Sequence, residues 1–184
     1  MDRIIETERL RLRPLRDNDA SDIAVLINNY DIAKNLARVP FPYALADAEE
    51  FLRWLKTCKG QSRFSAICLK NSSDGLQGII SYEWHDKKQD VELGYWLVKD
   101  LWGKGLMSEA AKAMVDHAFE IARVNVMVSC YFNENPASGK VLRHAGFEVV
   151  GTCLQMSKAQ GREVPVTNMR LTRERWLGKI SVKS

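Results

Sequence analysis

The chain has 184 residues, which suits one domain whose core is large enough to fold without disulfides. Apolar residues make up 46% and charged residues 27%, a balance that excludes a disordered chain, and no apolar run is long enough to span a bilayer. The formal net charge of +4 is mild, and no groove-reading motif accompanies the basic residues near the C-terminus, so nucleic-acid binding stays open only as a weaker alternative.

The N-terminal segment and the cysteines indicate the compartment. Residues 1–14 are charged throughout and match neither a signal peptide nor a membrane anchor. The four cysteines fall inside apolar patterns, without a CxxC or a Cys/His ligand spacing. We therefore expect a cytoplasmic protein with no membrane contact and no metal site, and with buried, reduced thiols at Cys58, Cys68, Cys130 and Cys153.

The first third of the chain predicts a strand and two helices. Residues 8–14 alternate leucine with arginine, which is typical of a half-exposed strand. Residues 19–29 carry apolar side chains at helical spacing, and two prolines make 39–43 a loop. Asp47, followed three residues later by Glu50, resembles a capping box that opens the second helix.

The rest of the chain alternates strands with helices. Two strands joined by a turn at 74–75 come first, then a turn at 86–89 and a third strand. The predicted strands are 64–69, 76–84, 91–98, 124–131, 147–152 and 164–171, and the predicted helices are 106–122 and 136–145. Hairpins followed by helix alternation predict an α/β (α+β) fold with a mixed, mostly antiparallel central sheet and helices on both faces. We expect a single domain over 1–176 and a flexible basic tail over 177–184.

A strand, a glycine loop and a helix follow one another at residues 91–108. Gly103 and Gly105 allow backbone N–H groups to converge, and the positive end of the helix dipole favours a phosphate there. The known phosphate loops do not match, because GxxxxGK followed by Ser or Thr is absent and Ser108 stands at the third glycine of GxGxxG. The loop alone is a weak signal.

A second group of residues surrounds the helix at 136–145. Asn135 is a good N-cap, Pro136 suits the first helical position, and Gly146 suits a left-handed residue after the last turn. Each of these has a purely structural explanation. Their combination with the glycine loop is what is specific.

These segments together resemble the GNAT superfamily of N-acetyltransferases, and most closely its RimJ/RimL-type ribosomal-protein N-terminal acetyltransferases. The pyrophosphate motif [Q/R]-x-x-G-x-[G/A] of the superfamily corresponds to Trp102, Gly105 and Met107, and its Asn-x-x-[Ala/Ser] motif to Asn135 and Ser138. The similarity runs in order through most of the chain, including the segments 8–14, 40–43, 47–51, 92–96 and 146–147.

The resemblance implies a sheet that splays where acetyl-CoA binds, between the strand ending at Val98 and the one ending near Tyr131. The pantetheine would pair with the backbone of 96–98, and the loop would hold the pyrophosphate. The implied cofactor-binding residues are Trp96, Leu97, Val98, Trp102, Gly103, Lys104, Gly105, Leu106, Met107, Ser108, Asn133, Asn135 and Ser138.

Three residues depart from the family pattern. Trp102 replaces Gln or Arg, and Met107 replaces Gly or Ala, so its side chain must point away from the cofactor. Leu142 stands where many members have a tyrosine that protonates the leaving thiolate. The resemblance then makes Ser138 the candidate that stabilises the thiolate, although simple hydrogen bonding at the helix end explains Ser138 equally well.

Acetyl transfer to an amine needs the neutral amine. A lysine requires about 3.5 kcal/mol more than an α-amine to reach this form at neutral pH, so a site with one modest base suits an α-amine. Glu92 is the candidate base and Glu83 the second candidate, while a solvated strand glutamate is the competing interpretation of Glu92.

The sequence therefore predicts an acetyl-CoA-dependent N-acetyltransferase. Its acceptor would be a protein N-terminal α-amine or a small-molecule amine such as a polyamine, an antibiotic or an amino acid, attacking directly in a ternary complex. A catalytically silent acyl-CoA-binding sensor is the main alternative, and the resemblance is compatible with a homodimer.

Overall fold

The computed structural model describes residues 4–58, 62–71, 75–84 and 90–181, with the side chains of 179–181 left aside. The predicted turn at 86–89 and the Asp74 half of the turn at 74–75 lie outside these ranges. The strands are β1 (Ile5–Glu6), β2 (Leu10–Pro14), β3 (Ser62–Leu69), β4 (Gly78–Trp84), β5 (Asp90–Leu97), β6 (Val126–Phe132), β7 (Glu148–Ser157) and β8 (Arg162–Thr172). The helices are α1 (Ala20–Ile27), α2 (Tyr30–Ala33), α3 (Leu45–Thr57), α4 (Leu106–Glu120), α5 (Pro136–Ala145) and α6 (Arg173–Ser181), with short 3-10 turns at Asp17–Asp19 and Lys99–Leu101.

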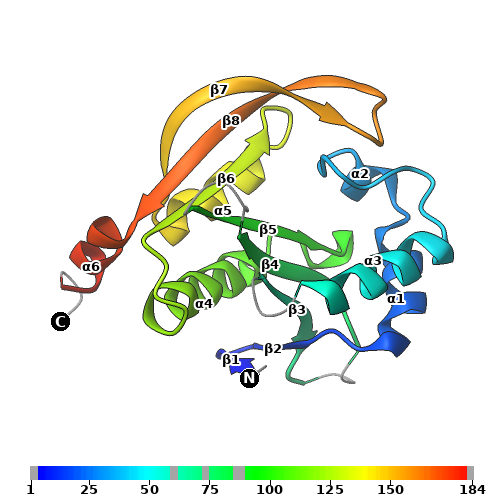
Figure 1. Cartoon of the computed structure of the whole chain (residues 1–184), viewed down its shortest axis with the longest axis horizontal. Helices are drawn as coiled ribbons and strands as arrows, with labels where there is room; N and C mark the ends of the chain where they lie inside the picture. Colours follow the sequence, from blue (N-terminus) through cyan, green and yellow to red (C-terminus); the bar gives the residue numbers. More distant parts are fainter. Residues whose placement is uncertain (1–3, 59–61, 72–74, 85–89, 182–184) are drawn as a thin grey trace.

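One sheet of eight strands runs through the molecule in the order β1-β2-β3-β4-β5-β6-β8-β7. Neighbouring strands pair antiparallel except β5 and β6, which pair parallel. Helices cover both faces, as Figure 1 shows for α4 and α5 on one side and α1 and α3 on the other. The predicted fold class is confirmed.

Each face of the sheet has its own core. Met114 of α4 and Leu142 of α5 pack with Leu93 of β5 on one face, and all three are fully buried. Ile23 of α1 packs with Ile79 of β4 on the other face. Truncating a buried side chain such as Met114 to alanine would destabilise the fold by about 2–5 kcal/mol. No helix within the described ranges is both long and apolar enough to traverse a bilayer.

The sheet divides between β5 and β6. Their parallel pairing covers three residue pairs, from Asp90 with Val126 to Glu92 with Val128, and β5 then continues to Leu97 without β6 beside it. Directly beyond the last pair, the Ser129 hydroxyl donates to the Leu93 carbonyl oxygen at 2.8 Å. This fork follows from the chain: β6 turns instead to β8, with which it pairs along its whole length.

Strand β2 is more buried than its alternating pattern predicts. The Arg13 side chain, expected to face solvent, is 2% exposed and donates two hydrogen bonds of 2.8 Å to Asp19. Burial opposes ionisation of Asp19, but hydrogen bonds from Arg13 and from the Arg16 backbone outweigh it and lower the pKa of Asp19. Covered on both faces, the strand retains an arginine because that arginine has a buried carboxylate partner.

Helix α3 begins two residues before the predicted cap. Ala44 is the N-cap, and Asp47 is the third helical residue, whose carboxylate accepts from the Ala44 backbone N–H at 2.8 Å. Asp47 thus takes the part that the sequence assigned to Glu50. The true start could not be recognised from the sequence, because the N-cap residue, Ala44, has no side-chain hydrogen-bond acceptor.

The cysteines differ from the expectation of four buried thiols. All four lie in the described ranges as thiols rather than disulfides, but only Cys68 is buried, Cys58 and Cys130 are half-buried, and Cys153 is exposed. Cys153 lies on β7, the last strand of the sheet, where almost every residue is exposed.

Helix α6 crosses the predicted boundary between domain and tail at 176–177. Trp176 is buried, stacks on Phe119 of α4 at 5.3 Å between ring centroids, and donates its indole N–H to Asp116 at 2.9 Å. Residue 176 is thereby attached to the main core.

Candidate functional site

The glycine loop precedes α4 in a conformation that requires glycine. Gly103 has φ +73° and Gly105 has φ +74°, and Gly105 is the N-cap of α4. A Cβ on Gly105 would lie 3.6 Å from the Arg9 guanidinium, an ordinary contact, so the backbone angle and not space demands glycine. The first N–H groups of α4 therefore emerge from an uncovered loop.

The turn between β1 and β2 fixes this loop from behind. Arg9 donates to the Lys104 carbonyl oxygen at 2.9 Å and to Glu109 of α4 at 2.6 Å. Glu109 also accepts from the Thr7 hydroxyl at 2.5 Å. Burial opposes ionisation of Glu109, but these bonds from Thr7 and Arg9 prevail and lower its pKa. Met107 packs against the main core.

The free edge of β5 faces the fork. The Leu93 carbonyl points to β6, since it accepts from Ser129, and strand alternation directs the backbone groups of Tyr95 and Leu97 the same way. The Val98 N–H points oppositely and donates to Gln77 at 2.9 Å. Of the predicted segment 96–98, only Leu97 thus directs its backbone N–H and carbonyl groups toward the fork. The Trp102 indole N–H donates to the Leu97 carbonyl oxygen at 2.8 Å.

Helix α5 closes the other side of the fork. It begins and ends at the predicted residues, with the Asn135 side chain accepting from the Ser138 N–H at 3.3 Å and Gly146 left-handed at φ +114°. A Cβ on Gly139 would lie 2.6 Å from the Tyr131 ring, so this glycine lets α5 lie directly on β6.

A tyrosine that the sequence argument did not select contacts Ser138. The Tyr95 hydroxyl lies 2.9 Å from the Ser138 hydroxyl and donates to the Ser138 carbonyl oxygen at 3.1 Å. Burial raises the pKa of Tyr95, so its hydroxyl stays protonated. Leu142, by contrast, is fully buried in the core. Asn133 accepts a hydrogen bond from the Thr167 hydroxyl at 2.8 Å.

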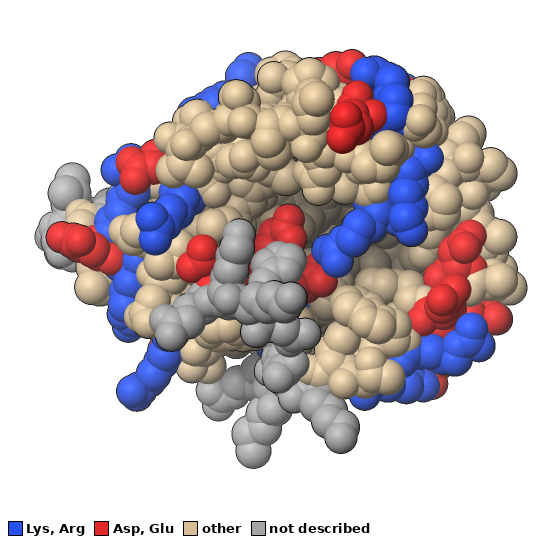
Figure 2. All heavy atoms as spheres, turned by 45° about the horizontal axis from the view of Figure 1, so that its top comes forward, with Lys and Arg blue, Asp and Glu red and all other residues tan. Residues whose placement is uncertain are grey.

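A cavity of about 720 Å³ opens on the α1–α3 side of the fork. Figure 2 shows a hollow in the surface with acidic atoms at its floor and basic side chains at its rim. Its aromatic wall includes Phe51, Trp54 and Phe64, whose ring centroids lie 5.6–6.1 Å apart. Glu92 and Ser138 both line it, so the cavity reaches the fork.

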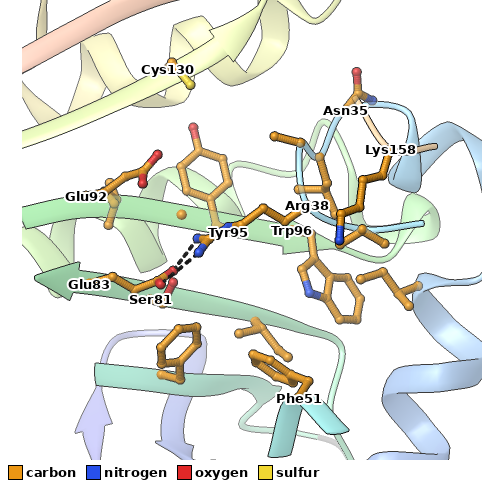
Figure 3. A pocket seen from close by; sticks show the side chains of 18 of the residues that line it. Asn35, Arg38, Phe51, Ser81, Glu83, Glu92, Tyr95, Trp96, Cys130 and Lys158 are labelled. Carbon is orange, nitrogen blue, oxygen red and sulfur yellow. Dashed lines mark hydrogen bonds and ion pairs between the residues drawn. The ribbon is translucent and has the colours of Figure 1, made fainter. Parts of the chain in front are cut away.

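Glu92 and Glu83 are neighbours across β5 and β4, directly opposite each other in the register. Glu83 is buried and accepts two hydrogen bonds from the Arg38 guanidinium, at 2.7 and 3.1 Å (Figure 3). Arg38 was not selected from the sequence, because it comes from the loop after α2.

The turn between β7 and β8 lies over this cavity. The Lys158 backbone N–H donates to the Ala37 carbonyl oxygen at 3.1 Å, and Gln160 donates to the Lys34 carbonyl oxygen at 2.9 Å. Figure 1 shows the long β7–β8 hairpin reaching across to the loop next to α2. Within the described parts of the chain, no three His, Cys, Asp or Glu side chains gather as metal ligands.

The family follows from these features and from the sequence match. The acetyltransferase (GNAT) domain family matches residues 9–148, and the chain belongs to this family. It is an N-acetyltransferase, an acyltransferase that uses acetyl-CoA.

Similar proteins cover nearly the whole chain. The uncharacterized N-acetyltransferase p20 of Bacillus licheniformis is 27% identical over 175 residues, which are 94% of this chain and 97% of that protein. The ribosomal-protein-S5-alanine acetyltransferase of Vibrio fischeri has a TM-score of 0.82 at 21% identity, over 95% of this chain and 99% of that one. The spermidine N-acetyltransferase of Vibrio cholerae, in complex with CoA and spermine, has a TM-score of 0.79 at 20% identity, over 93% and 99%.

Proposed function

We propose that this enzyme acetylates a protein N-terminal α-amine, by direct attack of the amine in a ternary complex with acetyl-CoA. The observation that carries the proposal is the cavity of about 720 Å³, which reaches the fork and has Glu92 and Ser138 among its lining residues. Its volume admits the first residues of a peptide chain, and α3 and the loop after α2 contribute to its lining.

The cofactor side fits an anionic, extended ligand. Acetyl-CoA supplies the acetyl thioester when it is bound. Residues 103–108 would hold its pyrophosphate through backbone N–H groups. The two left-handed glycines leave these N–H groups unobstructed, and the 15-residue helix α4 directs the positive end of its dipole toward them. The backbone edge at Tyr95 and Leu97 would take the pantetheine like an added strand, with Asn133 and Asn135 flanking it at α5.

Glu92 is the better base of the two carboxylates. Both oxygens of Glu83 accept from Arg38, and this bidentate pair already engages the carboxylate. Glu92 lies on the strand that forms the fork, and it lines the cavity. Its role is to take the proton of the acceptor ammonium, directly or through a water.

Ser138 and Tyr95 form the hydrogen-bond donor pair for the sulfur. The Tyr95 hydroxyl remains protonated, and its one proton can go to the Ser138 carbonyl oxygen at 3.1 Å or to the Ser138 hydroxyl at 2.9 Å. In the second arrangement, Ser138 can donate its own proton onward into the fork. This replaces the helix tyrosine whose position Leu142 occupies.

A cationic small molecule is the second candidate acceptor. The cavity lining holds the carboxylates of Asp47, Glu50, Glu83 and Glu92 against the two cations Arg38 and Lys158. An acidic, aromatic cavity favours a ligand with several amino groups. The similarity to a spermidine N-acetyltransferase points the same way.

Release of free thiol from acetyl-CoA distinguishes these acceptors. Peptides with a free α-amine should release thiol faster than the same peptides carrying a blocked N-terminus and an internal lysine, because the α-amine reaches its neutral form more easily. Faster turnover of spermine than of every peptide would favour the small-molecule acceptor. Acetyl-CoA binding without turnover of any amine would favour the silent sensor.

A homodimer through β7 belongs to the same proposal. β7 is a terminal strand of the sheet and exposes four large apolar side chains, at Val149, Val150, Leu154 and Met156. An exposed apolar edge pairs readily with a second copy of the same strand. Light scattering should give twice the monomer mass, and Leu154→Lys should reduce it to the monomer; a wild-type monomer at micromolar concentration contradicts the dimer.

A further inference from the structure

The carboxylate pair in the acceptor cavity is electrostatically unusual. Glu83 and Glu92 stand directly opposite each other on adjacent antiparallel strands, where side chains share a face and lie about 5 Å apart at Cβ. Like charges in this arrangement repel, and Glu83 is also buried. The pair therefore needs a cation nearby.

Arg38 supplies that cation from a distant part of the chain. It is separated from Glu83 by 45 residues and donates to both Glu83 oxygens, at 2.7 and 3.1 Å. The hydrogen bond to Glu83 raises the pKa of Arg38 despite its desolvation, and the charge of Glu92 acts in the same direction. Figure 3 shows the Arg38 side chain extended toward Glu83, with Glu92 on the neighbouring strand.

The backbone around Arg38 is held in place, but its side chain remains accessible. The carbonyl oxygens of Lys34 and Ala37 accept from the β7–β8 turn at 2.9 and 3.1 Å. The Arg38 side chain is 65% exposed, whereas that of Glu83 is 10% exposed. A ligand in the cavity can therefore reach the guanidinium and Glu92 together.

We propose that Arg38 is a built-in counterion of the acceptor site, which neutralises Glu83 so that a bound acceptor amine reaches its neutral form at a lower pH than it would beside two uncompensated carboxylates. This inference rests on the proposed function. Two carboxylates without the guanidinium would hold an acceptor as its ammonium form, which cannot attack a thioester. With Arg38 in place, the group formed by Glu83, Glu92 and Arg38 retains one net negative charge for recognition and avoids overstabilising the cation. Arg38 is thus a positioning and tuning residue for the acceptor, and it touches neither reacting atom.

Other charged and titratable groups face the same cavity. Asp47 and Glu50 project from α3, and together with burial they raise the pKa of Tyr43 to about 12. Cys130 of β6, whose pKa burial and the charge of Glu92 raise to about 11, lies on the fork side. Lys158 is the second cation of the lining.

The test is the pH dependence of kcat at saturating acetyl-CoA and acceptor. Arg38→Met should move the midpoint of the rising limb upward by about 0.5 to 1 pH unit, because the acceptor ammonium binds its proton more tightly when the positive charge is gone. At pH 7 this lowers kcat about three- to tenfold, while the plateau at high pH should stay within about twofold of the wild type.

Three further variants separate charge from structure. Arg38→Lys should restore most of the wild-type midpoint, since it returns the charge without the planar fork. The double variant Arg38→Met with Glu83→Gln should also return toward the wild type, because both charges of the pair are then removed. Lys158→Met removes a cation from the same cavity and should shift the midpoint by less than half as much, since Lys158 is not paired to Glu83 by any contact in the described residues.

The outcomes separate this inference from the proposed function. An unshifted midpoint in Arg38→Met, or an equal shift in Lys158→Met, overturns the role of Arg38 while wild-type turnover stands. A lower plateau with an unchanged midpoint would make Arg38 a purely structural residue and also overturns it. Absence of amine turnover in the wild-type enzyme would instead reject the proposed function itself.

Discussion

The two halves of the proposed active centre, a cofactor half and an acceptor half, are built on different principles. The cofactor half is local and made of backbone: the loop 103–108 and the edge of β5 present N–H and carbonyl groups, and Arg9 holds the loop from behind. The acceptor half is made of side chains from α3, the loop after α2, β4 and β5, and its key groups are Arg38, Glu83 and Glu92. A backbone site tolerates side-chain changes as long as its dihedral angles survive, whereas a charge cluster changes with every member. Substitutions can therefore change the acceptor specificity of such an enzyme while its use of acetyl-CoA is retained.

Glu92→Gln tests the acceptor half alone, and we expect the largest effect from it. Turnover at neutral pH should fall by about 10²- to 10⁴-fold, and the loss should shrink as pH rises because the amine then deprotonates unaided. Thiol-release assays at a series of pH values measure turnover, and calorimetry measures the affinity for acetyl-CoA. Acetyl-CoA affinity should be unchanged. A loss that is equal at all pH values would transfer the role of base to Glu83, for which Glu83→Gln is the matched control.

Ser138→Ala examines the junction of the two halves. If Ser138 donates to the sulfur, kcat should fall by about 10²- to 10³-fold with little change in melting temperature. Tyr95→Phe should produce a smaller loss in the same direction, since it removes the partner of Ser138 and leaves the donor. A destabilised protein with normal turnover would make Ser138 a residue of the helix end only.

Gly105→Asp should disable the cofactor half and spare the acceptor half. The aspartate places a carboxylate where the pyrophosphate charge would lie and strains a backbone at φ +74°. Acetyl-CoA affinity should fall about a hundredfold by calorimetry, and the melting temperature should fall only as far as it does in Gly105→Ala, because both variants carry the same backbone strain. Gly105→Ala has the strain without the charge, so its acetyl-CoA affinity should lie between those of the wild type and Gly105→Asp. Wild-type affinity in Gly105→Asp would move the pyrophosphate elsewhere.

Trp102→Gln, which introduces the usual family residue, should have the smallest effect and sharpens the contrast most. If binding relies on backbone groups, acetyl-CoA affinity should stay within about fivefold of the wild type, the equivalent of one hydrogen bond to Leu97. Calorimetry on this variant and on Trp102→Phe measures it. A change of twentyfold or more would mean that the indole itself is a principal binding group.

Local signals explain what the sequence could predict. Helix α5 begins and ends where Asn135, Pro136 and Gly146 place its caps, because each cap acts within one turn of its own residue. The order of the other strands and helices also followed from apolar periodicity, whereas β1, α2 and α6 were not predicted. These features need no knowledge of distant residues.

Distant contacts explain what could not be predicted. Arg38 bonds to a carboxylate 45 residues away, from a loop whose sequence has no repeating pattern. Alternation places Tyr95 on the face opposite Glu92 but says nothing of α5, and only the packing of α5 on β6 brings Ser138 to its hydroxyl. Arg13 resembled a solvent-facing residue because its partner Asp19 lies beyond the strand.

The fork has a consequence for self-association. A strand edge usually invites another protein chain to pair with it, and outer strands carry that hazard. Here the edge of β5 beyond Leu93 lies in the middle of an eight-stranded sheet, between α4 and α5 on one face and the acceptor cavity on the other. A slender linear ligand can enter such a slot, but a second folded chain, with the bulk of its own sheet behind it, cannot. The backbone edge of β5 beyond the Ser129–Leu93 hydrogen bond can thus pair with an extended ligand, in a place that another folded chain cannot reach.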